Sequence, residues 1–426
     1  LALTLAESGY EVFAWDINKD IMNNLRAGKS HVHEVGLVPL LKSELEKTNF
    51  KLPNNYYDIR ECNTYIICVN TPVYNKTPDL SYLVSSIKEL SSLLKSGDLI
   101  ILRSTIPIGT SRNKVKEIVE SETNLLVGKD ISVSFAPERT IEGKALEELK
   151  TLPQIIAGID QRSVLTTETI FSKFCNTIVK LDSTEEAEVV KLINNTFRDI
   201  SFAFANELVI MCESLNLDTT KIIRAANKGY PRNSIPLPSP GVGGPCLSKD
   251  PYILNSVNKQ IDHISLGIIG RQINSKIPLL ISQRILKRLT RLKKDISKSK
   301  IFVMGFAFKG RPETTDIRNS PTVDIIRHLL SKNNNIYGWD PIVSENQINS
   351  LNINWTTLEN GFNGADAILI MNNHEFFDSI DIYSLLKLSA SDVVFFDGWS
   401  VFNSTEIEKI KKVNYMNLGY LTQIAD

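Results

Sequence analysis

Short apolar runs alternate with amphipathic stretches over the first part of the chain, from Glu11 to about Asp182. The runs are rich in β-branched and aromatic residues and predict strands, whereas the stretches between them have the spacing of helices with one apolar face. The predicted strands are residues 11–16, 64–70, 98–105, 130–138, 153–159 and 176–181. Because strands and helices alternate, we expect a doubly wound, mostly parallel α/β sheet.

The pattern changes twice in the second half of the chain. Residues 184–216 form one helical stretch without Gly or Pro, which suits a connector between domains or a dimer surface. A loop rich in Gly and Pro and a second helical stretch at 264–292 follow, and strand and helix patterns then alternate again from residue 300. We therefore expect two Rossmann-like α/β domains joined by a long helix and a helical middle domain, with limits at 1–183, 184–294 and 295–426.

The chain begins at Leu1 inside a helical pattern that runs to Gly9. In a dinucleotide-binding domain, a strand and a glycine-rich phosphate loop come before the first helix. We therefore expect that both lie before Leu1 and that the first domain is truncated at its N-terminus.

The composition of the chain argues against nucleic acid and membrane surfaces as binding partners. The 48 Lys and Arg residues balance 48 Asp and Glu residues, so no global basic field attracts nucleic acid or a membrane surface. There is no apolar run of about 18 residues and no secretory signal pattern, and the five scattered cysteines form no Cys-x-x-Cys pair, so we expect a cytoplasmic protein. His31, His33 and His374 have no further ligand at metal-binding spacing, so we expect no metal.

Polar side chains follow three of the predicted strands. Asp16 ends the first, in the place where a carboxylate binds the adenosine ribose of a dinucleotide. Thr71 and Thr105 follow two others, and the carboxyl ends of parallel strands form the ligand crevice of such sheets. Each of the three residues could equally be a turn residue.

A fourth strand end carries Glu138, Arg139 and Glu142. Two carboxylates and a guanidinium there could transfer protons or position a substrate. A solvated loop would have the same composition.

The long helical stretch places Glu188, Lys191 and Asn195 on one face, because they are three and four residues apart. Lys191 and Asn195 can therefore point to the same oxygen and stabilise an alkoxide. The alternative is an exposed ion pair between Glu188 and Lys191.

The loop at 241–251 (GVGGPCLSKDP) is the most specific segment. Its glycines, among them Gly243, allow a ligand to approach the backbone closely. Asp250 and Pro251 predict the start of a helix beside Cys246, and Lys249 lies nearby, so we expect a thiol with a lowered pKa, as a nucleophile needs. The other four cysteines lie in or beside apolar patterns and are interpreted as core residues.

Five segments in this order resemble the UDP-glucose/GDP-mannose dehydrogenase family over essentially the whole chain. They are STIPIG (104–109), APERTIEG (136–143), EVVKLINN (188–195), GVGGPCLSKDP (241–251) and GFAFKGRPETTDIRNSP (305–321). HEVGL (33–37) is similar to the Glu-Pro-Gly-Leu stretch of the family. The resemblance implies that the C6 hydroxyl of a UDP-sugar is oxidised twice by NAD to a uronic acid, which feeds polysaccharide precursor synthesis.

The resemblance also implies roles for single residues. Cys246 would capture the aldehyde as a thiohemiacetal and later form a thioester. Lys191, Asn195 and Asp250 would stabilise oxyanions, and Glu138 and Thr105 would act on the water that hydrolyses the thioester. The implied cofactor contacts are Asp16, Thr71, Thr105, Glu142, Lys249 and Arg318, and the implied substrate contacts are Glu138, Arg139, Lys191, Asn195, Gly243, Phe308 and Lys309.

Two departures from the family pattern concern the sugar. The segment between Lys309 and Arg318 is longer than in typical UDP-glucose enzymes, and Trp399 follows Asp397 and Gly398 where many of them have Arg. A UDP-N-acetylhexosamine is therefore as plausible as UDP-glucose. A homodimer or higher homo-oligomer is implied. The alternatives are a two-electron β-hydroxyacid-type dehydrogenase and a non-catalytic protein that binds nucleotide sugars.

Overall fold

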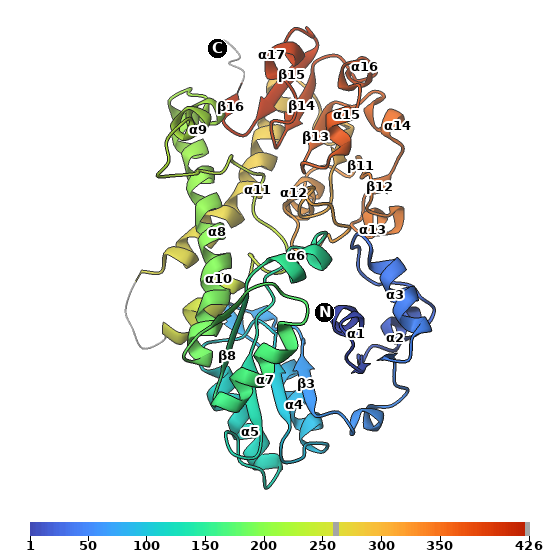
Figure 1. Cartoon of the computed structure of the whole chain (residues 1–426). Coiled ribbons are helices and arrows are strands. Elements are labelled where there is room, and N and C mark those ends of the chain that lie inside the picture. Colours follow the sequence, from blue (N-terminus) through green and yellow to red (C-terminus); the bar gives the residue numbers. More distant parts are fainter. Residues whose placement is uncertain (259–263, 422–426) are drawn as a thin grey trace. The chain divides into compact units, whose positions relative to one another are not determined.

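The computed structural model describes residues 1–258 and 264–421. The described chain forms two compact units, one built from residues 1–195 and 252–258 and the other from 196–251 and 264–421. The boundary falls inside helix α8 (Thr184–Ser214), labelled in Figure 1, so this helix begins in the first unit and ends in the second.

The first unit contains a five-stranded sheet in the order β3-β6-β7-β8-β9. Its strands are β3 (Thr64–Ile67), β6 (Leu99–Leu102), β7 (Ser132–Phe135), β8 (Gln154–Gly158) and β9 (Ile178–Lys180). All neighbours are parallel except β7 and β8. Strands β1 (Val12–Phe13) and β2 (Phe50–Lys51) pair with each other in a separate parallel sheet. The expectation of a mostly parallel sheet is therefore confirmed.

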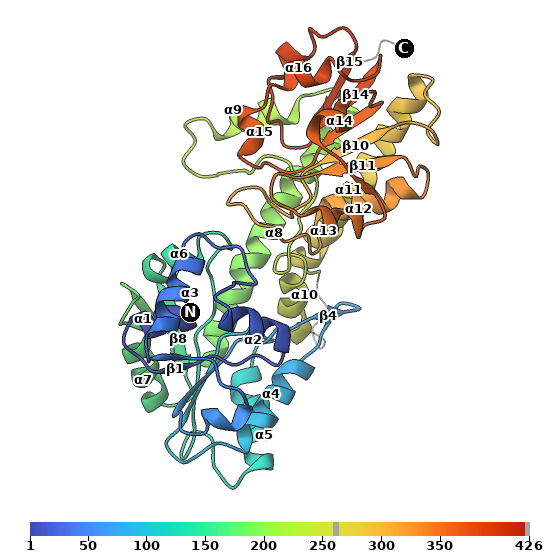
Figure 2. The same ribbon diagram turned by 90° about the vertical axis from the view of Figure 1, so that its right-hand side faces the viewer.

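Helices cover both faces of this sheet. Helices α4 (Ser81–Ser91) and α5 (Val115–Glu122), side by side in Figure 2, pack on Ile100 and Leu102, whereas α1 (Ala2–Glu7) and α7 (Gln161–Phe171) pack on Leu99 and Ile101. Alternate residues of β6 thus face opposite layers, and all four are buried, as expected of a central parallel strand. The other elements are α2 (Lys19–Arg26), α3 (Leu37–Glu46), η1 (Tyr56–Ile59), β4 (Val73–Tyr74), β5 (Thr77–Pro78), η2 (Thr110–Lys114) and α6 (Ala145–Thr151).

The second unit contains a seven-stranded sheet in the order β12-β11-β10-β13-β14-β15-β16. Its strands are β10 (Ile301–Met304), β11 (Ile336–Trp339), β12 (Asn354–Trp355), β13 (Ala367–Ile370), β14 (Val393–Asp397), β15 (Val413–Asn417) and the antiparallel β16 (Tyr420–Leu421). The chain leaves β10 toward β11 and returns to its other side at β13. Strand order therefore reverses between β10 and β13, and such sheets bind ligands at this point.

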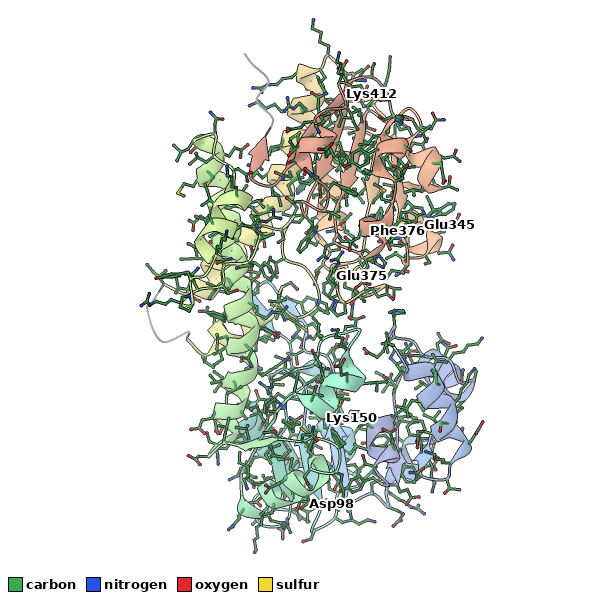
Figure 3. The ribbon with its side chains drawn as sticks, turned by 45° about the horizontal axis from the view of Figure 1, so that its top comes forward. Asp98, Lys150, Glu345, Glu375, Phe376 and Lys412 are labelled. Carbon is green, nitrogen blue, oxygen red and sulfur yellow. The ribbon has the colours of Figure 1, made fainter. Side chains whose placement is uncertain are left out.

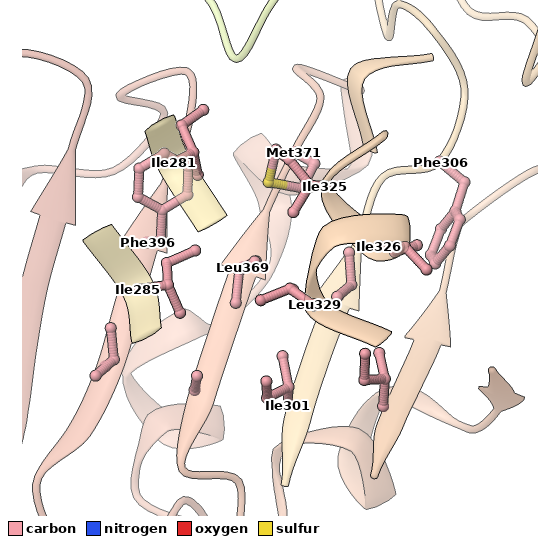
Figure 4. Packing of buried hydrophobic residues seen from close by; sticks show 14 of the residues in the cluster. Ile281, Ile285, Ile301, Phe306, Ile325, Ile326, Leu329, Leu369, Met371 and Phe396 are labelled. Atoms are coloured by element: carbon pink, nitrogen blue, oxygen red, sulfur yellow. The ribbon is translucent and has the colours of Figure 1, made fainter. Parts of the chain in front are cut away.

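Two apolar layers enclose this sheet. On one face, Ile301 and Leu369 pack against α11 (Leu266–Arg291) and α12 (Pro321–Leu330), as Figure 4 shows. On the other face, Phe302 and Phe395 pack against short helices. These and the remaining helices are α9 (Thr219–Asn227), α10 (Asp250–Asn255), η3 (Ser256–Asn258), α13 (Glu345–Asn349), α14 (Leu358–Phe362), α15 (Phe376–Ser379), α16 (Ile382–Leu386) and α17 (Ser404–Ile407).

Two glycines let α11 lie close to the part of α8 that belongs to the second unit. A Cβ at Gly267 would stand 2.8 Å from the side chain of Thr196, and one at Gly270 would stand 3.4 Å from Ala203. Small residues three apart on one helix face permit this approach. Over residues 1–258 and 264–421, no helix has the length and apolar character needed to cross a membrane.

Candidate active site

In the first unit, Arg103 follows β6 and holds Glu138. The Arg103 guanidinium donates to Glu138 Oε2 from Nε at 3.1 Å and from Nη2 at 2.6 Å, and its Nη1 donates to the Ala136 carbonyl and to Gln154. The backbone N–H of Thr140 donates to Glu138 Oε1. Burial raises the pKa of Glu138, but Arg103 and the Thr140 N–H outweigh burial and lower it to about 2.

Glu138 is therefore a fixed anion at neutral pH, suited to accept a hydrogen bond from a water rather than to store a proton. Arg103 was missed in the sequence analysis, although it stands beside Thr105 at a strand end. Arg139, a predicted substrate contact, is half-buried and donates to the Pro153 carbonyl.

Glu34, in the HEVGL segment, reaches the end of the APERTIEG loop. Its carboxylate accepts the N–H groups of Gly143 at 2.9 Å and Ala145 at 2.7 Å. This ties together segments about a hundred residues apart, and it fixes the half-buried Glu142 from its C-terminal side. No sequence signal marks this contact beyond the resemblance of HEVGL to the family stretch.

Two predicted cofactor contacts have different surroundings. Thr71, after β3, is buried, and its hydroxyl has no hydrogen-bond partner in the described part of the chain. An orphaned buried hydroxyl at the carboxyl end of a parallel strand fits a bound dinucleotide. Asp16 is exposed, and its Oδ1 accepts the Asn18 N–H at 2.7 Å, so it does form the turn considered as the alternative.

Helix α8 carries three predicted residues on one face. Lys191 is buried and Asn195 half-buried, whereas Glu188 is fully buried and faces the start of η2. Glu188 accepts the N–H of Gly109, the N–H of Ser111 at 2.9 Å and the Ser111 hydroxyl at 2.6 Å. The alternative of an exposed ion pair between Glu188 and Lys191 is therefore wrong, because Glu188 is buried against the loop that follows Thr105.

Burial raises the pKa of Glu188 to about 7, although the hydrogen bonds from Ser111 and Gly109 oppose that rise. Glu188 thus lies under the loop that carries Thr105 and on the helix turn before Lys191. Ile106 and Ala187 belong to the same buried cluster, which confirms that this loop packs on α8.

In the second unit, Cys246 heads a tight turn that leads into α10. Its side chain is exposed, and its carbonyl accepts the N–H groups of Lys249 at 3.1 Å and Asp250 at 3.0 Å. The Lys249 ammonium pairs with the fully buried Asp250 carboxylate at 2.8 Å. The predicted helix start at Asp250 is observed.

The other cysteines differ from one another. Cys175 and Cys212 are buried, as expected of core residues, and Cys62 is half-buried. Cys68, directly after the end of β3, is exposed, so the core interpretation is wrong for it.

The glycines before Cys246 make room for other parts of this unit. A Cβ at Gly243 would lie 2.3 Å from the Asn319 carbonyl oxygen, and one at Gly244 would lie 2.7 Å from the Phe308 ring. At these two positions the close approach expected of a ligand is instead made by protein atoms, the Asn319 carbonyl and the Phe308 ring. The Asn319 amide also donates to the Ser248 hydroxyl at 3.0 Å, so the Cys246 loop packs against both ends of the 305–321 segment.

The 305–321 segment lies where strand order reverses. Gly305 follows β10, and a Cβ there would meet the buried side chain of Asn372, two residues after β13. Lys309 is half-buried with its ammonium 5.6 Å from the Phe308 ring centroid. Arg318 is exposed and forms a bidentate pair with Asp316.

His374 stabilises this segment. Its Nδ1 accepts the N–H of Phe376, labelled in Figure 3, so its Nε2 carries the proton and donates to Glu313 at 3.0 Å. Over the described residues, no group of three or more His, Cys, Asp or Glu side chains could hold a metal ion. His374 thus joins Glu313 of the 305–321 segment to the loop after β13.

Family models match three successive parts of the chain. The NAD binding domain of the UDP-glucose/GDP-mannose dehydrogenase family matches residues 1–175, its central domain 185–275 and its UDP binding domain 302–404.

Single relatives match nearly the whole length. A UDP-N-acetyl-D-mannosamine dehydrogenase of Pyrococcus horikoshii is 32% identical over 406 residues, which cover 95% of this chain and 94% of that protein. A solved structure of that enzyme type from the same organism has a TM-score of 0.89 and covers 98% of this chain and 96% of its own. A Staphylococcus aureus UDP-N-acetyl-mannosamine dehydrogenase has a TM-score of 0.84 at 29% identity, covering 98% and 95%. This chain therefore belongs to the UDP-glucose/GDP-mannose dehydrogenase family and is an NAD-dependent nucleotide-sugar dehydrogenase.

Proposed function

We propose that the protein oxidises the C6 hydroxyl of UDP-N-acetyl-D-mannosamine to the uronic acid in two steps, through a covalent intermediate on Cys246. The observation that carries this proposal is the exposed thiol of Cys246 at the head of a turn held by packed glycines. The choice of sugar is supported by relatives at 30–32% identity that carry this substrate in their names. The product serves polysaccharide precursor synthesis.

Different residues would act in the two oxidation steps and in the final hydrolysis. Lys191 and Asn195 stabilise the alkoxide as the alcohol loses its proton, and NAD, when bound, accepts a hydride in each oxidation. The Cys246 thiolate adds to the aldehyde to form a thiohemiacetal, whose oxidation gives a thioester. Water then attacks the thioester carbonyl, which releases the carboxylic acid and restores the thiol. Glu138, held ionised by Arg103, and Thr105 orient that water.

Thr71 and Asp16 would hold NAD in the first unit, with Glu142 as a further cofactor contact. Thr105, Lys249 and Arg318 complete the proposed cofactor contacts. The orphaned buried hydroxyl of Thr71 supports this assignment, because a buried donor without a partner costs free energy unless a ligand accepts from it.

Phe308 and Lys309 would hold the UDP part of the substrate, with Arg139 and Gly243 as further substrate contacts. Asp250 would act with Lys191 and Asn195 on the oxyanions. Trp399 favours an acetamido sugar over glucose. Its indole N–H donates to the Met371 carbonyl at 3.0 Å, and the preceding Gly398 would clash with Pro240 if it had a Cβ, since the two would be 2.6 Å apart. A neutral ring stands where many UDP-glucose enzymes of the family have the guanidinium of an arginine. Trp399→Arg should raise kcat/KM for UDP-glucose relative to UDP-N-acetylmannosamine.

The working form is a homodimer or higher homo-oligomer. Large apolar side chains on α8 are exposed at a spacing of seven residues, namely Phe197, Phe204 and Met211. A stripe at this spacing lies along one side of a helix and is typical of helix–helix association.

The proposed domain limits stay 1–183, 184–294 and 295–426, and α8 is the first element of the middle domain. A cytoplasmic location suits the reaction, because a reducing compartment keeps Cys246 as a thiol.

Stoichiometry tests the proposal. The full chain, supplied with NAD and a panel of UDP-hexoses and UDP-N-acetylhexosamines, should yield two NADH per sugar consumed and no free aldehyde. Cys246→Ala should abolish acid formation, whereas Cys62→Ala, a half-buried thiol, should not. One NADH per sugar with accumulating aldehyde would instead identify a two-electron dehydrogenase. Binding of a UDP-sugar without NAD binding in calorimetry would identify a non-catalytic protein.

Alkylation gives a second test that is independent of turnover. Iodoacetamide should label Cys246 quickly near neutral pH, and a UDP-sugar should slow this labelling. The buried Cys175 and Cys212 serve as internal controls. Equal labelling of all cysteines in the native protein would count against Cys246 as the nucleophile.

A further inference from the structure

The guanidinium of Arg271, on α11, reaches the backbone on both sides of Cys246. Its Nη2 donates to the Val242 carbonyl at 2.9 Å, and its Nη1 donates to the Leu247 carbonyl at 3.4 Å. Val242 stands four residues before Cys246 and Leu247 directly after it. Arg271 is only 4% exposed, so these bonds lie away from water.

The Arg271 guanidinium is itself held by the carboxylate of Asp199. Asp199, on α8 and fully buried, accepts from Arg271 Nη1 at 2.8 Å and from the Asn274 amide at 2.8 Å. Asn206 donates to Asn274 at 2.9 Å. A planar guanidinium paired with a carboxylate has one orientation, which is why its remaining donors are aimed at fixed points.

The same network also fixes the start of the loop. The Asn206 carbonyl oxygen accepts the Ser239 N–H at 3.0 Å, and the Ser239 hydroxyl donates to the Gly241 carbonyl at 3.0 Å. Polar bonds from two long helices therefore hold the loop from residue 239 to 247. We call these five buried side chains the Arg271 network: Asp199, Asn206, Ser239, Arg271 and Asn274.

The glycine-containing loop at 239–247 needs hydrogen bonds from other elements to keep one conformation. Gly241 and Gly244 have φ angles of +131° and +86°, which side-chain-bearing residues rarely adopt, and glycine confers little stiffness of its own. A nucleophile must stay within reach of the carbon it attacks while that carbon passes from alcohol to aldehyde to thioester. Without external bonds the loop would leave the Cys246 thiol free to move.

We propose that Arg271 is a positioning residue for the Cys246 nucleophile, which it acts on through the Val242 and Leu247 carbonyls. This inference rests on the proposed function, because it takes Cys246 as the group that captures the aldehyde. Arg271 would touch neither the substrate nor NAD. The consequence of loosening the network is poor capture of the aldehyde, which then leaves the enzyme after one oxidation.

The test variant is Arg271→Lys in the full chain. Lysine keeps the positive charge beside Asp199, but one ammonium cannot span both carbonyls in the plane of a guanidinium. The matched control is Arg288→Lys, which changes another buried arginine of α11 seventeen residues further along. At 1.5 Å per residue it lies roughly 25 Å from Arg271.

Three measurements are made on both variants and on the wild type. Arg271→Lys should lower kcat by about 10- to 100-fold with KM for the UDP-sugar changed less than about threefold, because misplacement by about 1 Å has an effect of that size. The NADH yield per sugar should fall from two toward one, and a carbonyl-trapping reagent should capture the released aldehyde. In hydrogen–deuterium exchange, peptides over 240–250 should exchange faster, while peptides over 277–289 stay unchanged.

Several outcomes overturn the proposal. If Arg271→Lys and Arg288→Lys lose activity equally and both loosen α11, Arg271 only stabilises the helices. An unchanged NADH yield with unchanged exchange at 240–250 also refutes it. If Arg271→Lys does not fold, Asp199→Asn, which keeps an acceptor for the guanidinium but removes its charge, should show the same exchange confined to the loop. If the wild-type chain itself yields no acid, the proposed function fails, while the exchange data still decide whether Arg271 holds the loop.

Discussion

Glu188 gives the most direct test of how burial acts on this fold. The carboxylate is fully buried and accepts three hydrogen bonds from Gly109 and Ser111, and burial nevertheless raises its pKa to about 7. The folded state therefore holds the Glu188 proton more tightly than the unfolded chain does. The stabilisation that results is fully present below pH 4.5 and is lost as the pH rises through 7.

The size of the effect follows from the two pKa values. A change from 4.5 to about 7 corresponds to about 3 kcal/mol, at 1.36 kcal/mol for each pH unit. Glu188→Gln removes the titration but keeps the size of the side chain. Relative to this variant, the wild type should lose about 3 kcal/mol of unfolding free energy between pH 4.5 and 8. For a domain of this size, that is roughly 6–12 °C in the melting temperature of the first unit.

The assay is thermal unfolding of both proteins from pH 5 to pH 8, with the difference in melting temperature plotted against pH. Glu185→Gln is the matched control, because Glu185 lies on the same helix but pairs with Arg112 at the surface. Its difference curve should be nearly flat. Parallel curves for the wild type and Glu188→Gln would refute the reasoning, because Glu188 would then titrate alike in the folded and unfolded chains.

Three further predictions concern the loops around the site. Gly244→Ala should destabilise the second unit by about 1–3 kcal/mol in urea unfolding, because a Cβ would strike Phe308 and the φ angle is +86°. Glu34→Gln should weaken the hold on the two N–H groups at the start of α6 by about 1 kcal/mol and speed their hydrogen exchange. His374→Leu should cost about 1–2 kcal/mol, seen as a lower melting temperature, because the hydrogen bonds from His374 to Glu313 and from the Phe376 N–H to His374 are both lost.

Local patterns were enough to predict most of the architecture. The helix expected at 184–216 is observed as Thr184–Ser214, and the one expected at 264–292 as Leu266–Arg291. Long helices are predictable because their apolar spacing repeats over many turns. Strands β12, β15 and β16 were missed. The first and last have only two residues, and so short a strand exists only through its neighbour in the sheet.

The reactive residues of the site were predicted from the sequence, but the contacts that hold these residues in place were not. Cys246 was found because its loop combines glycines, a thiol and a helix start within a few residues. The sequence could not show that Gly243 and Gly244 accommodate Asn319 and Phe308, since those contacts join segments more than 60 residues apart.

Charged side chains that bind backbone groups across the fold are the hardest to read from a sequence. Arg103 binds Glu138 and the Ala136 carbonyl, Glu188 binds the Ser111 N–H, and Arg271 binds the Val242 carbonyl. Backbone groups carry no sequence signature, so nothing at the partner position marks the contact. Substitution of such a residue leaves the proposed nucleophile and oxyanion groups intact yet should lower kcat through the loop it holds. Loss of activity alone therefore cannot distinguish these residues from catalytic ones, whereas exchange rates of the loop and the yield of NADH per sugar can.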